Sequence, residues 1–344
     1  MAPCNNTTLP WAEYSPLTDT AAPPVSRTKR RLLIFIALSV AVIYIGATVL
    51  TDAPKAHEAL VELGWSGCIL VLALSAINYT LRFYRWQSFL ARLGHTLPTP
   101  LHFLYYVSGF AFTVSPAKVG EAFRSIHLRE HGVAYSESLA ALFAERLLDL
   151  VAMCLLASLI AVEHVAYRPL IAGVTIIGVV LLVMACHPFL PRRLRSISDA
   201  STHPKLVRPL ATLAKLLQSS HLILQPKPAA FGVAIGLVSW GAEGLGLYLI
   251  CQGLHLNVTA PTAIGIYAIA SLAGSAAFFV PAGIGGMEIV MTTLLIAHAA
   301  PLRTAVIATL LCRIATLWFA VLIGVAASTI VEFQAAHRHI RSAS

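Results

Sequence analysis

Charged side chains are scarce in this chain of 344 residues, since Asp, Glu, Lys and Arg together make up 11% of it. A soluble domain carries about 25% of such residues. Apolar residues make up 58%, and the mean hydropathy is +0.78. This composition excludes an ordinary soluble globular protein and predicts a chain that resides in a lipid bilayer.

Cysteine and nucleotide-binding motifs are also sparse. The six cysteines are scattered along the chain, without the spacing of metal or redox sites. We therefore expect small packing residues, with no metal and no other cofactor. The pattern Gly-x-x-x-x-Gly-Lys-Ser/Thr does not occur, which argues against direct drive by ATP. A nucleic-acid partner is not expected either.

Six apolar runs are long enough to cross about 30 Å of hydrocarbon, which takes roughly 17 to 25 helical residues. They are Leu32–Leu50, Trp65–Tyr84, Ser138–Ala161, Leu170–Cys186, Ala229–Cys251 and Thr304–Ile330. Two further stretches, Leu101–Ser115 and Ala263–Ile296, are short or interrupted by Pro and Gly. The sequence thus predicts an all-α polytopic membrane protein with about six full spans and two re-entrant or broken helical segments.

A five-residue signature occurs once with each broken segment. The first copy is Pro116-Ala117-Lys118-Val119-Gly120 and the second is Pro281-Ala282-Gly283-Ile284-Gly285. Gly109 and Gly274 precede the two prolines at the same offset. Paired broken segments in two halves of a membrane chain are typical of transporters built from repeats.

Loop charge predicts the orientation, because cytoplasmic loops carry the excess of Lys and Arg. Bases precede the first run at Arg27, Lys29, Arg30 and Arg31. Segment 188–228 holds seven bases and one acid, and Arg338 and Arg341 lie near the C-terminus. Both termini and this segment are therefore expected in the cytoplasm. An odd number of spans then separates the signatures, so the second copy is inverted relative to the first.

These boundaries give a predicted domain organisation. A disordered cytoplasmic tail is expected over residues 1–30, a single transmembrane domain over 31–332, and a basic cytoplasmic tail over 333–344. The two halves of the domain are residues 31–187 and 229–332, joined by the basic loop 188–228. The expected location is the cytoplasmic (inner) membrane.

Ionisable residues inside the apolar segments are the candidate functional residues, because each costs at least about 2.5–3.5 kcal/mol to insert. Six bases and five acids nearly balance, which favours pairing around a polar groove. They are Arg82, Arg85, Lys118, Glu121, Arg124, Glu145, Arg146, Asp149, Glu243, Glu288 and Arg313. The alternative for Arg82, Arg85 and Lys118 is snorkelling to the cytoplasmic interface.

Spacing predicts which of these residues share a helix face. Arg146 and Asp149 are three residues apart, Glu145 and Asp149 four, and Glu121 lies three before Arg124. These groups are expected to line one cavity.

The broken segments offer a second kind of binding group. A helix that begins just after Pro116 or Pro281 exposes backbone N–H groups that can hold a phosphate. Glycine allows unusual backbone angles and close approach of a ligand to the backbone. The candidate positions for such approach or for gating are Gly120, Gly283, Gly285 and Gly286. The alternative is that these glycines only allow tight helix packing.

At these residues the sequence resembles the flippase-like integral membrane family that includes the transmembrane domain of lysylphosphatidylglycerol synthases. The resemblance covers roughly Leu32 to Ile330. Its carriers are Leu81–Trp86, Ser115–Arg124, Glu145–Asp149, Trp240 with Glu243, Pro281–Glu288, and Arg313. Ala282 departs from a glycine that is frequent there in this family. The resemblance implies movement of lipids between leaflets, and a fold that can be fused to a soluble aminoacyl-transfer domain.

The sequence therefore predicts a lipid translocator rather than an enzyme. Its expected substrate is a phospholipid, an aminoacylated lipid or a lipid-linked precursor, with the charged residues around the headgroup. Two alternatives stay open. One is an accessory membrane subunit that partners a lipid-modifying synthase. The other is an integral membrane transferase in which Glu145 and Asp149 act as general base or nucleophile-orienting groups on a lipid-linked substrate.

Overall fold

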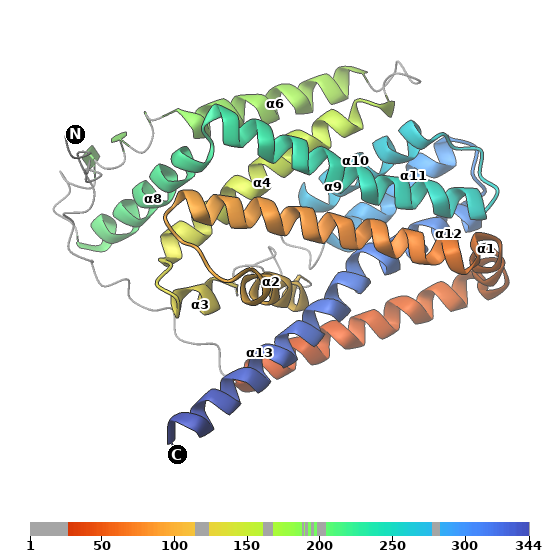
Figure 1. The fold of residues 1–344 in the computed structure, drawn as a ribbon. Coiled ribbons are helices and arrows are strands. Elements are labelled where there is room, and N and C mark those ends of the chain that lie inside the picture. The colour runs from red at the N-terminus through yellow and green to blue at the C-terminus, as the bar shows by residue number, and fades with distance from the viewer. Residues whose placement is uncertain are drawn as a thin grey trace, which may run out of the picture.

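The computed structural model describes residues 27–113, 124–160, 168–187, 204–276 and 283–343, together with 189, 192–193 and 196–197. Within these ranges every regular element is a helix (Figure 1). Most of the predicted tail over 1–30 and the first signature, residues 116–120, lie outside them. So do Glu121, Pro281 and Ala282.

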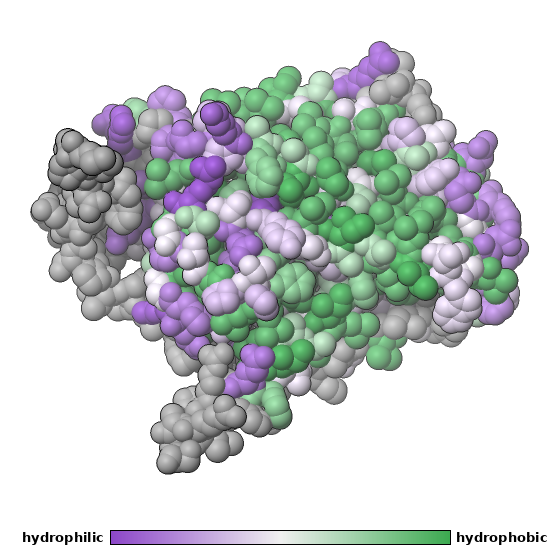
Figure 2. Space-filling model, viewed as in Figure 1, coloured by the Kyte–Doolittle hydropathy of each residue, from purple (hydrophilic) through white to green (hydrophobic). Residues whose placement is uncertain are grey.

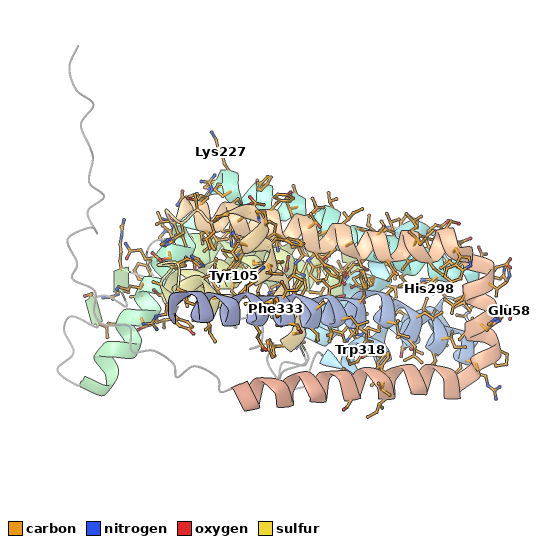
Figure 3. The ribbon with its side chains drawn as sticks, turned by 60° about the horizontal axis from the view of Figure 1, so that its bottom comes forward. Glu58, Tyr105, Lys227, His298, Trp318 and Phe333 are labelled. Atoms are coloured by element: carbon orange, nitrogen blue, oxygen red, sulfur yellow. The ribbon has the colours of Figure 1, made fainter. Side chains whose placement is uncertain are left out.

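The chain begins with α1 (Arg27–Arg92), which turns back on itself so that its two arms run in opposite directions (Figure 1). These arms hold the first two predicted spans. Glu58 lies in the connection between them, at one end of the molecule (Figure 3). The remaining helices are α2 (Thr99–Ser108), η1 (Gly109–Phe112), α3 (Arg124–Arg129), α4 (Tyr135–Ala157), α6 (Arg168–Cys186), α8 (Pro204–Ile223), α9 (Pro226–Gly253), α10 (Ala260–Ala276), α11 (Gly286–Ala297), α12 (Leu302–Arg313), η5 (Ile314–Trp318) and α13 (Phe319–Ala343).

Three of the described helices are long and apolar enough to cross a membrane: Ala56–Arg92, Pro226–Gly253 and Leu302–Gln334. Shorter apolar helices accompany them at Ile171–Val180, Ala260–Ala276 and Gly286–Ala297. On the face shown in Figure 2, apolar residues cover the middle and polar residues gather at the two ends. The prediction of an all-helical, multi-pass membrane protein is confirmed at this level.

Two large hydrophobic clusters form most of the described interior, beside a smaller one around Tyr44 and Trp318. One is built by α9, α10, α11 and α12, with Leu247, Ile266 and Met291 buried in it. The other joins the second arm of α1 to α2, α4 and α13 around Trp86 and Phe110. The first cluster comes mainly from α9 to α12, and the second mainly from α1, α2, α4 and α13. Residues that lie between the two clusters are therefore at the junction of two packed bodies.

Helix α13 crosses η1 at Gly324 with backbone against backbone. A β-carbon at Gly324 would lie 2.2 Å from the nitrogen of Ala111. Only glycine permits this approach, which places α13 beside the segment that leads toward the first signature.

Candidate functional site

The first group of buried charges is assembled by α1, α3 and α4. The second arm of α1 supplies Arg82 and Arg85, which are one helical turn apart and therefore point the same way. Helix α4 supplies Glu145 and Asp149, which are four residues apart and also share a face, and α3 begins with Arg124. All five side chains are buried. The predicted sharing of a helix face by Glu145 and Asp149 is confirmed, because both bind Arg85.

Two of the arginines bind these carboxylates closely. Arg85 Nη2 lies 2.6 Å from Asp149 Oδ1, and Arg124 Nη2 lies 2.8 Å from Glu145 Oε2. Arg85 Nη1 also donates to the carbonyl of Gly232 at 3.1 Å, which ties α1 to α9. The Arg124 guanidinium stacks on Trp86, 3.6 Å from its ring centroid. These contacts fix Arg85 and Arg124 as parts of the packed scaffold.

Two other arginines approach the same carboxylates more loosely. Arg82 Nη2 lies 3.5 Å from Glu145 and 3.7 Å from Asp149, and Arg146 lies 3.8 Å and 3.7 Å from them. These separations allow Coulomb attraction but are longer than charge-assisted hydrogen bonds of about 2.7–2.9 Å. Among the described residues, four guanidinium groups of this network thus face the carboxylates of Glu145 and Asp149.

Two interpretations of Arg82 and Arg85 were open: a place in a polar groove, or snorkelling to the cytoplasmic interface. Their side chains are 7% and 0% exposed, and each is ion-paired inside the protein. Snorkelling to an interface is therefore wrong for both.

The second group of charged residues comes from α9, α11 and α12, and tyrosines of α1 and α10 bind to it. Arg313 Nε donates to Glu288 Oε1 at 2.7 Å, and Tyr44 from the first arm of α1 donates to the same oxygen at 3.2 Å. The other oxygen of Glu288 accepts the backbone N–H of Gly285 at 2.7 Å, which caps the start of α11. Glu243 on α9 accepts a short hydrogen bond from Tyr267 on α10.

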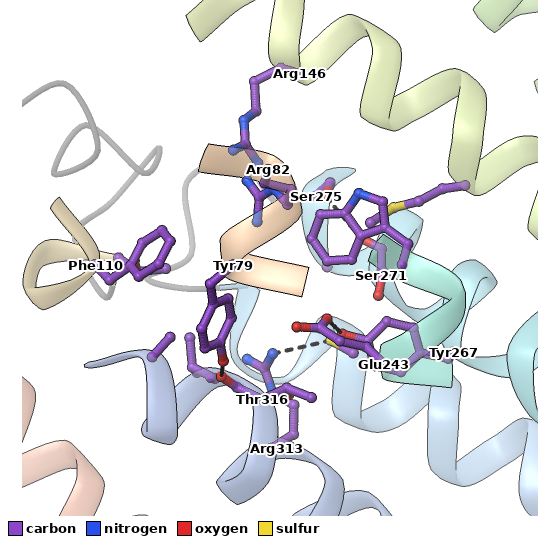
Figure 4. A pocket seen from close by; sticks show the side chains of 17 residues that line it. Tyr79, Arg82, Phe110, Arg146, Glu243, Tyr267, Ser271, Ser275, Arg313 and Thr316 are labelled. Atoms are coloured by element: carbon purple, nitrogen blue, oxygen red, sulfur yellow. Dashed lines mark hydrogen bonds between the residues drawn. The ribbon is translucent and has the colours of Figure 1, made fainter. Parts of the chain in front are cut away.

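A cavity of about 100 Å³ lies between the two groups. Arg82 and Arg146 are at one end of it, and Glu243, Arg313 and Thr316 are at the other, with Ser271 and Ser275 between them (Figure 4). Arg85 and Arg124 do not belong to its lining. Arg82 and Arg146, which lie farther from Glu145 and Asp149 than Arg85 and Arg124 do, are thus the arginines of this network that line the cavity.

The helix wall beside Arg313 is irregular. Residues Ile314–Trp318 form a π-helical turn between α12 and α13. Tyr79 donates to the carbonyl of Thr316 in this turn at 2.5 Å. Such turns are rare and are found frequently at functional sites.

The described part of the second signature has a defined structural role. Gly283 and Gly285 have φ angles of 64° and 92°, in the region that side chains disfavour. A β-carbon on Gly283 would lie 2.4 Å from the carbonyl oxygen of Gly274. The contact of Gly283 with Gly274 on α10 favours the alternative that these glycines allow tight packing, and Gly286 is the first residue of α11.

The structure thus brings together Arg82, Arg146, Glu243 and Arg313 around the cavity, while Arg85, Arg124, Glu145, Asp149 and Glu288 support them. Lys118, Glu121, Pro116, Gly120 and Pro281 lie outside the described residues. Reasoning from sequence missed Tyr79, Tyr267 and Ser271 on the wall. The sequence does not show whether a tyrosine or serine within an apolar run lines a cavity or packs against a neighbouring helix.

Metal chemistry finds no support in the part of the chain that the structure describes, where no group of three or more His, Cys, Asp or Glu side chains could hold an ion.

A multi-pass helical protein with buried ion pairs around an internal cavity is the class that these features define. The chain belongs to the family described as the transmembrane region of lysylphosphatidylglycerol synthases, which matches residues 32–324. Only this transmembrane region is matched, and the resemblance seen at the sequence motifs is confirmed. Comparison with curated proteins gives no match.

Proposed function

We propose that this protein is a lipid translocator that moves a phospholipid, an aminoacylated lipid or a lipid-linked precursor between the leaflets of the cytoplasmic membrane. The observation that carries the proposal is the division of the arginines. Arg85 and Arg124 are held by the carboxylates at 2.6–2.8 Å, whereas Arg82 and Arg146 are 3.5–3.8 Å away and line the cavity. An anionic headgroup can bind the second pair while the first keeps the carboxylates in place.

The position of the cavity supports a transport mechanism. It lies at the junction of the two hydrophobic clusters, with Tyr79 and Phe110 from one and Tyr267 and Met287 from the other. A rocking of these two bodies would open the cavity to one leaflet and then the other. The acyl or prenyl chains would stay in the bilayer throughout.

The inverted repeat and the orientation are parts of the same proposal. Six spans with two re-entrant segments would place α10 and α11 as the second broken pair, entered and left from the outer side. The N- and C-termini and the loop 188–228 would be cytoplasmic. In support, Glu58 and His298 lie at one end of the molecule and Lys227 at the other (Figure 3).

The geometry of Glu145 and Asp149 favours transport over the transferase alternative. A general base must reach the proton that it removes, at about 2.6–3.2 Å. Both carboxylates are buried and neutralised by arginines, so they have the contacts of structural groups.

An accessory role is supported by the family itself, since its description names a synthase that modifies a lipid. In that case the lipid product of a separately encoded synthase would be the substrate that this chain moves. Co-purification of such a synthase with the full chain would support the accessory role.

Leaflet exchange in liposomes tests the proposal. The purified chain is reconstituted with labelled lipids of several headgroups, beside Arg82→Gln and Arg313→Gln. Loss of a hydrogen bond to a charged group costs about 1.5–3 kcal/mol, so exchange should fall about tenfold or more. Arg92→Gln and Arg303→Gln are matched controls, because they are exposed positions on the same helices.

Three outcomes would contradict this assignment. Absence of exchange by the wild-type chain with every headgroup, or appearance of a new lipid product in mass spectra, would remove the translocator. Exchange that is the same in Arg82→Gln, Arg313→Gln and the controls would leave transport standing but remove these residues from its path.

A further inference from the structure

We propose that a groove between α6 and α9 binds one acyl chain of an anionic phospholipid, whose headgroup lies at the basic end of the groove. Among the described residues, the lining of this groove shares none with the lining of the cavity in Figure 4. The proposal therefore goes beyond translocation. It concerns a lipid that stays bound to the outer surface of the helices, and not the lipid that is moved.

The groove is almost entirely apolar. It has a volume of about 670 Å³ and lies between α6 and α9, which run side by side along one face of the molecule (Figure 1). Leu182 and Val183 line it from α6, and α9 contributes residues from Pro226 to Leu237. Within the described structure, His187 is its one polar lining residue. The volume is in the range of about 300–1,000 Å³ that is usual for sites of small ligands.

Small side chains on α9 make this space. Ala230 and Ala234 are exposed and line the groove. On another face of the same helix, an added β-carbon at Gly232 or Gly236 would lie 2.6 Å or 2.8 Å from side chains of α4. Those two glycines serve close helix packing, as small residues commonly do in membranes. The alanines instead border the gap between α6 and α9, so a bilayer component fills the space that a larger side chain would occupy.

The length of the groove matches the depth of one leaflet. Along α9 its lining runs from Pro226, the first residue of the helix, to Leu237. About 11 residues at about 1.5 Å each give a length of about 16 Å. Half of the hydrocarbon core measures about 15 Å. Since α9 is long and apolar enough to cross a membrane, the groove begins at one membrane surface and ends within the nearer leaflet. An acyl chain of that leaflet has this length and this chemistry.

Basic groups gather where the groove reaches the membrane surface. The Nδ1 atom of His187 accepts the backbone N–H of Phe189 at 3.2 Å, so in the neutral ring Nε2–H is a donor. The Arg193 guanidinium carbon lies 5.9 Å from the ring centroid of Phe189. Lys227, next to the lining residue Pro226, is exposed at the same end (Figure 3). Such a basic end of an apolar space between membrane helices complements an anionic headgroup.

The test maps where lipids contact the full chain in nanodiscs. Two probes are used at low mole fraction, a phosphatidylglycerol and a phosphatidylcholine that carry a diazirine in the same acyl chain. The residues labelled on illumination are identified by mass spectrometry. Label on Ile289, an exposed apolar residue of α11, measures random contact with bilayer lipid.

Two pairs of variants separate the acyl chain from the headgroup. Ala234→Trp fills the groove, and its control is Val238→Trp, one turn further along α9, at a position that is exposed and outside the lining. Lys227→Gln removes a base from the end of the groove. Its control is Lys215→Gln, which removes an exposed base of α8 that is also outside the lining.

We expect phosphatidylglycerol to label the groove of the wild-type chain at least tenfold more than Ile289. Ala234→Trp should remove most of this excess and Val238→Trp should keep it, both with wild-type thermal unfolding midpoints. A base near an anionic lipid is worth about fivefold in affinity. Lys227→Gln should therefore lower the labelling by phosphatidylglycerol about fivefold without changing that by phosphatidylcholine, and Lys215→Gln should change neither.

Three results would contradict the site. Equal labelling of the groove and Ile289, or equal labelling in Ala234→Trp and Val238→Trp, would overturn the bound acyl chain. Equal labelling by the two lipids, or labelling by phosphatidylglycerol that Lys227→Gln leaves unchanged, would overturn the anionic headgroup. A groove without label in a chain with the mass of a dimer would mean that a second copy covers it. Because labelling is measured without transport, this proposal and the translocator can fail separately.

Discussion

At the scale of single residues, the distances around Glu145 and Asp149 separate structure from function. A carboxylate buried in a membrane protein is tolerated when it is paired. Arg85 and Arg124 provide that pairing at 2.6 and 2.8 Å, together with Tyr106, which donates to Glu145 at 3.1 Å. If an anionic headgroup binds Arg82 or Arg146, Glu145 and Asp149 therefore each keep an arginine partner.

The pair of Arg85 and Asp149 gives a stability prediction. Asp149→Asn leaves Arg85 buried without its closest counter-charge, and breaking a buried pair costs about 3–5 kcal/mol. The thermal unfolding midpoint in detergent should fall clearly. The double variant Arg85→Met/Asp149→Asn removes both charges and should recover most of the loss.

A double-mutant cycle on these positions measures the coupling. Glu137→Gln on the same helix is the control, because Glu137 pairs with His95 outside the cluster. Additive losses in the double variant would contradict a direct interaction between Arg85 and Asp149.

The residue scale also shows what the sequence could reveal about the site. Charges within apolar runs are conspicuous, so Arg82, Glu145, Asp149 and Arg313 were accessible to prediction. Which arginine binds a carboxylate closely and which lines the cavity depends on differences of about 1 Å between N–O distances. The amino-acid sequence does not encode such differences.

At the scale of elements, the length of the apolar runs predicted several helices. The runs Leu32–Leu50 and Trp65–Tyr84 are the arms of α1, and Ala229–Cys251 lies within α9. The π-helical turn Ile314–Trp318 was not foreseen, because its sequence is as apolar as its neighbours. Its irregular backbone is stabilised by a distant contact, the hydrogen bond from Tyr79 to Thr316.

Close helix crossings give the prediction at this scale. Gly324→Ala puts a methyl group 2.2 Å from the backbone nitrogen of Ala111, so α13 and η1 must separate. Such overpacking costs about 1–3 kcal/mol. The unfolding midpoint should fall, and leaflet exchange should fall with it, because η1 carries Phe110 into the cavity wall.

Gly173→Ala is the matched control for this substitution. Gly173 lies within α6 and has nothing within 4 Å of an added β-carbon. Alanine has the higher helix propensity, so its midpoint should be unchanged or raised. A midpoint of Gly324→Ala equal to that of wild type would show that the crossing can relax without cost.

At the scale of the whole molecule, two packed clusters meet at a cavity between two polar ends. The helices α9 to α12 contribute Glu243, Tyr267 and Arg313. In the other cluster, Trp86 stacks on Arg124, which binds Glu145 of α4. Movement of one cluster against the other would therefore change the distance between the two ends of the cavity. This is the change that alternating access requires.

Orientation in the membrane is tested by labelling single cysteines from one side. In a background with Cys4, Cys68 and Cys186 changed to serine, His255→Cys and Lys227→Cys are treated with a membrane-impermeant maleimide. Both positions are exposed, and they terminate α9 at opposite ends. Because basic segments stay in the cytoplasm, His255→Cys should react in intact cells and Lys227→Cys only after permeabilisation. The reverse pattern would invert the proposed topology, and reaction of both in intact cells would mean that α9 does not cross the membrane.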